Sequence, residues 1–132
     1  MSPDLCQMNM KFMKSTIFSI WIVAIAALSV MPYSKNGAAS FKLTGSGMVV
    51  HSIAYFVGSC LLYWTLRKDT LFSILFSCFS IFLFSVVLEI VQFYLPNRTF
   101  NPMDIAANGF GIFFFVICWA TFWKKRFRNL GI

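Results

Sequence analysis

The sequence predicts an all-α membrane protein: a four-helix antiparallel transmembrane bundle with both termini in the cytoplasm. Two observations on composition and one on spacing predict it. The 132 residues are 59% hydrophobic and only 11% charged, whereas soluble domains carry about 25% charged residues. The apolar residues form runs of about 20 residues, the length that a helix needs to cross a hydrocarbon core about 30 Å thick. Short polar segments join the runs, so neighbouring helices are expected to alternate in direction.

The first apolar run follows a cytoplasmic basic leader, residues 1–14, in which Lys11 and Lys14 come just before the run. A helix is predicted over about 15–32 and is expected to stop at Pro32, because proline disfavours helical backbone in the residue before it. A basic segment followed by an apolar core is also typical of a signal peptide. We interpret the run as a retained helix. It is slightly long for a signal core, contains Trp21 and has no clear small-x-small cleavage site after it.

The other three helices are predicted over about 47–66, 70–95 and 102–123, which completes a transmembrane domain over residues 15–123. A basic cytoplasmic tail, residues 124–132, follows them. Pro96 is expected to break the third helix. Asn101 followed by Pro102 predicts an N-cap and a proline at the first position of the fourth helix.

Positive charge sets the predicted orientation. The leader, the polar turn at 67–69 and the tail share one side of the membrane, and they hold eight of the eleven Lys and Arg residues. Because cytoplasmic segments carry the excess of Lys and Arg, this side is predicted to be the cytoplasm. The net charge of +7 does not indicate a nucleic-acid partner. The charges are scattered between apolar runs, and such a partner needs a continuous basic face.

The four cysteines, Cys6, Cys60, Cys78 and Cys118, show no spacing typical of a metal site. Three of them fall inside apolar runs, where cysteine behaves as a small hydrophobic residue. The sequence therefore predicts free thiols, no metal and no cofactor.

Polar side chains gather at one end of the predicted bundle, on the outer side of the membrane. They are His51 and Tyr55 on the second helix, Glu89 and Gln92 on the third, Arg98 in the next loop, and Asp104 and Asn108 on the fourth. Each helical pair is three or four residues apart, so its members share a helix face. The convergence predicts an outward-facing polar pocket built from these seven residues.

Simpler interpretations exist for most of these residues. His51 and Tyr55 are each compatible with an interfacial side chain. Asp104 suits the third position of a capped helix, where a carboxylate also favours the helix dipole. Asn108 precedes two glycines and is compatible with close helix packing. Glu89 is the least easily explained without a function, because an ionisable group inside a spanning helix is costly and marks a functional site by default.

The spacing of this polar set resembles that of the VanZ-like family of small bacterial membrane proteins. The matching pattern is His51-x3-Tyr55 followed by Glu89-x2-Gln92-x5-Arg98-x5-Asp104-x3-Asn108, within residues 47 to about 115. The chain departs from the family at Gly47-Met48, where members often carry Asp-Lys, and at Phe115, where they have glycine. The resemblance implies a multi-pass protein of a bacterial cytoplasmic membrane, with a link in some members to glycopeptide (teicoplanin) resistance or surface-polysaccharide loci.

The first functional hypothesis is that the pocket binds or modulates an anionic lipid-linked or cell-envelope component, with membrane lipids as the surrounding partners. Arg98 would contact a phosphate through its guanidinium group. Asp104 and Glu89 would position Arg98 and His51, while Gln92 and Asn108 would supply neutral hydrogen bonds. The oligomeric state is left open.

Two alternatives belong to other classes. The protein could be an enzyme acting on a lipid phosphate, with His51 and Glu89 as the acid–base pair. No nucleophile motif or metal cluster supports this reading. It could also be a small proton-coupled exporter with Glu89 as the proton carrier. Against this, coupling carboxylates usually lie near the bilayer midplane, and Glu89 is near a helix end. The serines of the third helix recur at helical spacing, which favours close approach of a neighbouring helix over a proton path: they are Ser73, Ser77, Ser80 and Ser85.

Overall fold

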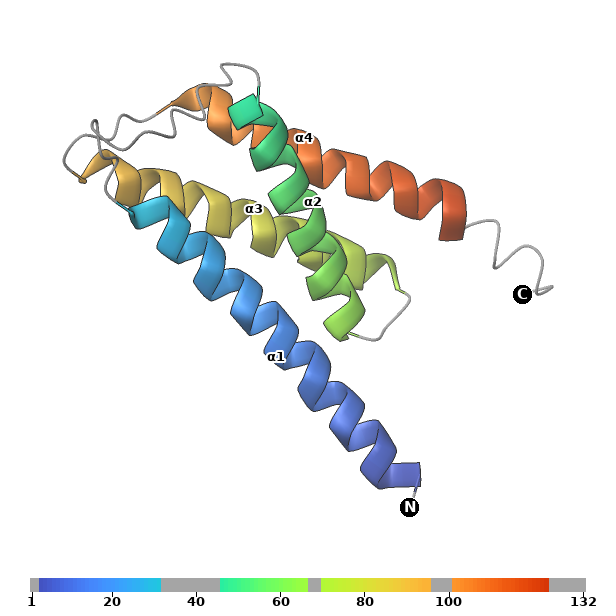
Figure 1. The fold of residues 1–132 in the computed structure, drawn as a ribbon. Helices are drawn as coiled ribbons and strands as arrows, with labels where there is room; N and C mark the ends of the chain where they lie inside the picture. The colour runs from blue at the N-terminus through green and yellow to red at the C-terminus, as the bar shows by residue number, and fades with distance from the viewer. Residues whose placement is uncertain (1–2, 32–45, 67–69, 96–100, 124–132) are drawn as a thin grey trace.

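The computed structural model describes residues 3–31, 46–66, 70–95 and 101–123. These ranges hold the helices α1 (Pro3–Val30), α2 (Ser46–Leu66), α3 (Leu71–Phe93) and α4 (Pro102–Cys118), and a closing π-helical turn η1 (Trp119–Trp123) (Figure 1). Four helices in this part of the chain are long and apolar enough to cross a membrane. The predicted all-α class with four potential membrane spans is confirmed.

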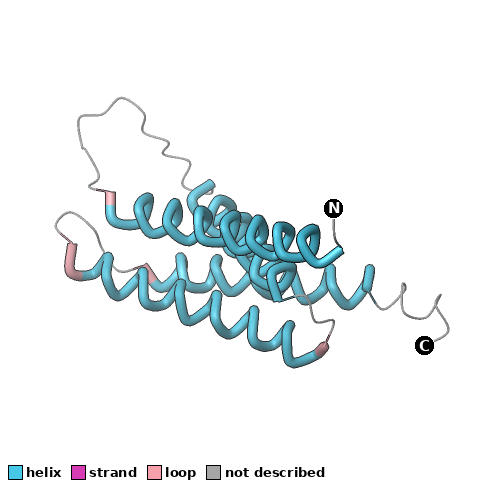
Figure 2. Tube along the Cα trace, turned by 90° about the horizontal axis from the view of Figure 1, so that it is seen from below, coloured by secondary structure: helices cyan, strands magenta, loops and turns pink. Residues whose placement is uncertain are grey.

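Successive helices alternate in direction (Figures 1 and 2). The first turns of α2 and α4 lie at the end of the bundle where α1 and α3 finish; we call this the His51 end. The opposite end, where α1 and α3 begin, is called the Lys14 end. Toward its N-terminus α1 diverges from the other helices, as Figure 1 shows. The packed part of the molecule is therefore nearer the His51 end of α1.

The first helix starts earlier than predicted, at Pro3 and not near residue 15. Proline suits the first helical position, and the Leu, Met, Gln and Lys residues of the leader are good helix formers. At 1.5 Å per residue the 28 residues of α1 make a helix about 42 Å long. Its last residue is Val30, two residues before the predicted end, which fits the effect of proline on the preceding backbone.

Side-chain caps begin the third and fourth helices. Thr70 precedes α3 and its Oγ1 accepts a hydrogen bond from the Ser73 backbone N–H at 3.3 Å. Asn101 caps α4, because its Oδ1 accepts from the Met103 N–H at 3.1 Å, and Pro102 follows it. The predicted cap at Asn101 is confirmed. Each cap satisfies one of the backbone donors that a helix start leaves unpaired.

The closest approach in the bundle joins α2 to α4. A Cβ added at Gly111 would collide with the Ser52 carbonyl group, so only glycine fits there. The Ser52 hydroxyl lies 2.9 Å from both the Met48 and the Ala107 carbonyl oxygens, within α2 and across to α4. In a bilayer the hydrophobic effect does not drive helices together, because the lipid tails are as apolar as the side chains. Helices associate there through close packing at small residues and through interhelical hydrogen bonds.

The apolar core lies below this contact, toward the Lys14 end. One cluster consists of Tyr55, Leu62, Ile81 and Ile112. The next contains Tyr63, Ile74 and Phe115, with the rings of Tyr63 and Phe115 centred 5.8 Å apart. Phe115 thus forms part of the core.

Contacts of Trp21 and Lys14 help to attach α1 to α2. The indole ring of Trp21 packs on Gly58 so tightly that a Cβ at that glycine would overlap it, and it meets Tyr55 edge-on at 6.2 Å. Near the Lys14 end, the Lys14 ammonium donates to the Trp64 carbonyl at 3.3 Å and lies 4.4 Å from the centroid of that indole ring. The positive charge of Lys14, on α1, therefore lies beside the C-terminal turn of α2, where it interacts favourably with the negative end of the helix dipole.

Candidate functional site

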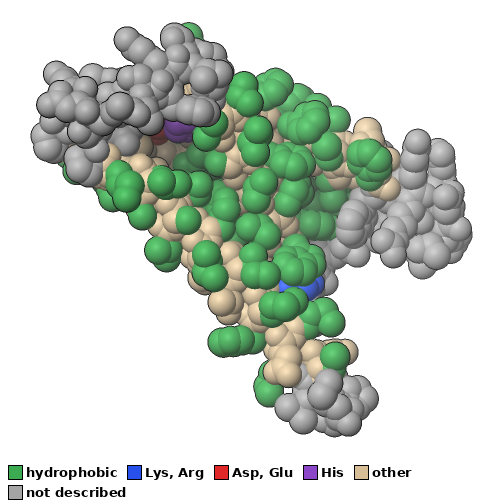
Figure 3. All heavy atoms as spheres, in the orientation of Figure 1, with side chains coloured by type: hydrophobic (Ala, Val, Ile, Leu, Met, Phe, Trp, Pro, Cys, Tyr) green, Lys and Arg blue, Asp and Glu red, His purple; other side chains and the backbone are tan. Residues whose placement is uncertain are grey.

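The candidate site lies at the His51 end, inside the bundle. Figure 3 shows the histidine and acidic side chains at this end of a face that is otherwise mostly hydrophobic. Six of the seven predicted residues fall in the described part of the chain; Arg98 lies in 96–100, outside it. The structure brings five of the six together: His51, Tyr55, Glu89, Gln92 and Asn108.

A hydrogen-bonded relay connects α2, α4 and α3. His51 Nδ1 lies 2.9 Å from Asn108 Oδ1, and Asn108 Nδ2 donates to Ser85 Oγ at 3.2 Å. Asn108 and Ser85 are completely buried. With the amide oxygen accepting from Nδ1, the lone pair of the neutral imidazole is on Nε2. The relay therefore fixes both the orientation of the ring and its tautomer.

A small cavity adjoins the imidazole, between α1, α2 and α3. It has a volume of about 140 Å³, and its polar lining comes from Ser29, His51, Tyr55 and Gln92. Water occupies about 30 Å³ per molecule in the liquid, so this space suits a few waters or one small polar group. Three of the predicted residues thus border a single cavity, on two different helices.

The wall contributed by α1 was not anticipated from the sequence. Gln92 Nε2 donates to the Ser29 carbonyl oxygen at 3.1 Å, which ties the end of α3 to the end of α1. Ile25 and Leu28 complete this side of the cavity. The available signal was Ser29 itself, a polar residue next to the last residue of an apolar helix.

Glu89 lies about one turn before Gln92 on α3 and is almost completely buried, at 2% exposure. Ser85, Glu89 and Gln92 are spaced four and three residues apart, so one face of α3 carries them all. The carboxylate interacts electrostatically with the buried hydroxyl of Tyr55 on α2. An acidic group in this position is costly for a membrane helix, which is consistent with a role beyond packing.

Asp104 is placed differently from the other five. Its Oδ1 accepts a hydrogen bond from Asn101 Nδ2 at 3.2 Å, in the first turn of α4. Its own backbone N–H bonds to the Asn101 carbonyl at 3.0 Å. The structure therefore gives Asp104 a part in the start of α4, the simpler of the two interpretations drawn from the sequence.

Further serines of α3 lie nearer the Lys14 end of the bundle. Ser73 and Ser77 are buried there, and the Ser77 hydroxyl donates to the Ser73 carbonyl at 2.7 Å within α3. Between Ser77 and Ser85 lies Ile81, 2% exposed, in one cluster with Leu62 and Ile112. Ser80, the residue before Ile81, is half-buried, so polar side chains of α3 also occur between Ser77 and Ser85.

No metal-binding group of three or more His, Cys, Asp or Glu residues occurs in the part of the chain that the structure describes. The four cysteines are free thiols, three of them half-buried between helices. The chemistry available at the site is therefore that of one oriented imidazole, one carboxylate, a phenol and two amides.

Comparison of the chain with protein-family models, with curated proteins and with solved structures gives no match.

Proposed function

We propose that this protein is a VanZ-like multi-pass protein of a bacterial cytoplasmic membrane, and that its outward-facing polar cavity binds or modulates an anionic lipid-linked or cell-envelope component. The observation that carries the proposal is the cavity at the His51 end, where His51, Tyr55 and Gln92 converge. The VanZ-like pattern extends the proposal to a role in glycopeptide (teicoplanin) resistance. The outward orientation follows from the excess of Lys and Arg predicted on the other side.

The groups around the cavity suit a small anionic group such as a phosphate. The amide N–H₂ of Gln92 is a hydrogen-bond donor to phosphate oxygen, and the Nε2 lone pair of His51 can accept a hydrogen bond from the O–H of a singly protonated phosphate. The volume of about 140 Å³ admits a headgroup fragment but not a whole lipid. Arg98, which follows Gln92 by six residues in the sequence, is the further phosphate contact that we propose.

Binding can be measured on the full chain in nanodiscs of uncharged lipid, with dodecyl phosphate as the anionic probe and dodecanol as its uncharged counterpart. We expect dodecyl phosphate to bind more tightly than dodecanol, and His51→Ala or Gln92→Ala to remove the difference. Ser19→Ala, an exposed position on α1, is the control and should bind as the unchanged protein does. Equal binding of the two probes would contradict the proposal.

One observation favours an enzyme as the second candidate. The His51–Asn108–Ser85 relay leaves the Nε2 lone pair for proton transfer, which is the arrangement that a general base needs. Glu89 would then act with His51 on a lipid phosphate. Release of inorganic phosphate from dodecyl phosphate by the purified protein, lost in His51→Ala, would support this candidate. Binding without any turnover would support the first proposal.

The position of Glu89 weakens the exporter hypothesis. Glu89 lies in the last two turns of α3 (Leu71–Phe93), whereas coupling carboxylates usually lie near the bilayer midplane. A proton-coupled carrier needs its coupling group to communicate with both membrane faces in turn. We therefore do not adopt it.

A further inference from the structure

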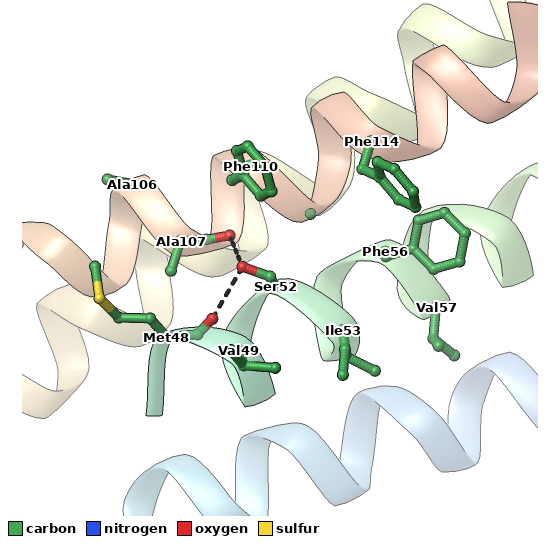
Figure 4. A pocket seen from close by; sticks show the side chains of 11 residues that line it. Met48, Val49, Ser52, Ile53, Phe56, Val57, Ala106, Ala107, Phe110 and Phe114 are labelled. Atoms are coloured by element: carbon green, nitrogen blue, oxygen red, sulfur yellow. Dashed lines mark hydrogen bonds between the residues drawn. The ribbon is translucent and has the colours of Figure 1, made fainter. Parts of the chain in front are cut away.

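A groove on the lipid-facing surface runs between α2 and α4, on the side of α2 away from the cavity. Its volume is about 780 Å³, and Figure 4 shows the side chains that line it. On α2 the lining begins at Met48 and continues to Val57; on α4 it begins at Ala106 and continues to Phe114. The groove thus starts in the first turns of both helices, at the His51 end.

The groove offers almost no hydrogen-bonding capacity. The polar side chain in its lining is Ser52, and the dashed lines in Figure 4 join its hydroxyl to the Met48 and Ala107 carbonyl oxygens, each 2.9 Å away. Its proton is therefore already used within the protein. The other lining side chains are aliphatic or aromatic. A polar occupant would lose its hydration without compensation, so the groove suits hydrocarbon.

The length of the groove distinguishes between two kinds of hydrocarbon occupant. The groove extends along α2 from Met48 to Val57, nine steps of 1.5 Å each, so it is about 14 Å long. This is about half of a hydrocarbon core about 30 Å thick. The aromatic rings of Phe56 and Phe114, centred 5.6 Å apart, lie at the inner end. A groove one leaflet deep matches a lipid chain, which ends near the midplane, better than a helix of another chain, which crosses both leaflets.

The groove and the polar site share the same turns of the same two helices. Ser52 and Ala107 face the groove, whereas their neighbours in sequence, His51 and Asn108, are joined by the 2.9 Å hydrogen bond of the site. A helix with its side chains is about 10 Å across. The groove and the cavity therefore lie on opposite faces of α2, separated by about the width of that helix.

We propose that the α2–α4 groove holds one hydrocarbon chain of the ligand, from the leaflet at the His51 end. The ligand class is then a membrane lipid with a small anionic headgroup. A free anion would fill the cavity but make no contact with the groove. This inference rests on the proposed function for the headgroup, while the chain is recognised by the groove itself.

The test compares anions with and without a chain in the full-length protein. Dodecyl phosphate and butyl phosphate carry the same headgroup, so their difference in affinity measures the contribution of the chain. Val49→Trp places an indole in the groove, and Val87→Trp is the matched control on the exposed surface of α3. We expect Val49→Trp to weaken dodecyl phosphate binding by about tenfold or more, which corresponds to about 1.4 kcal/mol. Butyl phosphate binding should not change, and Val87→Trp should affect neither probe.

Other outcomes separate the two proposals. If neither phosphate binds the unchanged protein, the headgroup proposal fails. The groove is then tested alone, with vesicles containing a phosphatidylcholine whose acyl chain carries a photoreactive group. Cross-links concentrated between Met48 and Val57, and lost in Val49→Trp, would support a chain site. Equal dodecyl phosphate affinity in Val49→Trp and the unchanged protein would overturn the inference. So would a dimer that Val49→Trp converts to a monomer, because a second copy would then occupy the groove.

Discussion

Asn108 on α4 holds the ring of His51 on α2: its Oδ1 lies 2.9 Å from Nδ1, and its Nδ2 donates to Ser85 on α3. One fully buried amide thus connects three helices and sets the tautomer of the histidine in the predicted site. A buried polar network of this kind rigidifies the bundle only when each member is satisfied. The same side chain is therefore expected to matter for stability and for the geometry of the cavity.

Replacing Asn108 by leucine should destabilise the bundle by about 1–3 kcal/mol, because it leaves buried polar groups on His51 and Ser85 without their amide partner. Double-mutant measurements in membrane proteins give smaller values, about 0.6 kcal/mol on average for one interhelical hydrogen bond. Unfolding in mixed micelles of mild detergent and sodium dodecyl sulfate would measure the change. Phe113→Leu, at an exposed position on the same helix, is the control. Equal stability of the two variants would contradict a structural role for the relay.

The two glycines that follow Asn108 should respond differently to alanine. At Gly111 a Cβ would collide with the Ser52 carbonyl group, so Gly111→Ala must push α2 and α4 apart. Forced overpacking of this kind typically costs about 1–3 kcal/mol. At Gly109 the nearest atom is Phe82 Cε2, 4.0 Å away, and alanine is the better helix former by about 1 kcal/mol. The same unfolding assay should therefore find Gly109→Ala neutral or stabilised. If Gly111→Ala had the same free energy of unfolding as the unchanged protein, the close contact of α2 and α4 would not lie at Gly111.

The two lysines before the first apolar segment should also differ. Lys14 is buried, donates to the Trp64 carbonyl and lies over that indole ring, whereas Lys11 is exposed. Lys11→Ala and Lys14→Ala each remove one positive charge from the same helix. We expect Lys14→Ala to lower the free energy of unfolding by about 2 kcal/mol, the scale of a hydrogen bond to a charged group together with a cation–π contact. Lys11→Ala should leave it unchanged. If both variants lose the same amount, net charge and not the Trp64 contact is responsible.

Much of this arrangement could be predicted from one sequence. Run length gives the four spans, and the Asn101-Pro102 pair gives the start of α4, because these depend on local composition and backbone chemistry. Helical spacing also places Glu89 and Gln92 on one face of α3. The start of α1 at Pro3 was missed because the polar leader was not expected to be helical, although nothing in it breaks a helix.

The tertiary part could not be predicted because it depends on how each helix is rotated against its neighbours. Ser29 enters the site only because the end of α1 packs beside Gln92. The helical spacing of Ser85 favours a packing role, and only the structure shows that its hydroxyl also accepts a hydrogen bond from Asn108. Asp104 had two compatible interpretations from spacing alone, and its bond to Asn101 supports the capping one.

The orientation of the bundle remains a prediction, and it decides which side of the membrane the cavity faces. Positions 36 and 99 lie in the two segments that the positive-inside rule places outside the cell. Single cysteines introduced there, at Asn36 and Thr99, in a protein whose four native cysteines are replaced by serine, should react with a membrane-impermeant maleimide on whole cells. A cysteine at position 68, in the turn predicted to be cytoplasmic, is the control and should react only after the membrane is permeabilised. Protection of both outer positions together with labelling of position 68 would reverse the topology, and the cavity would then face the cytoplasm.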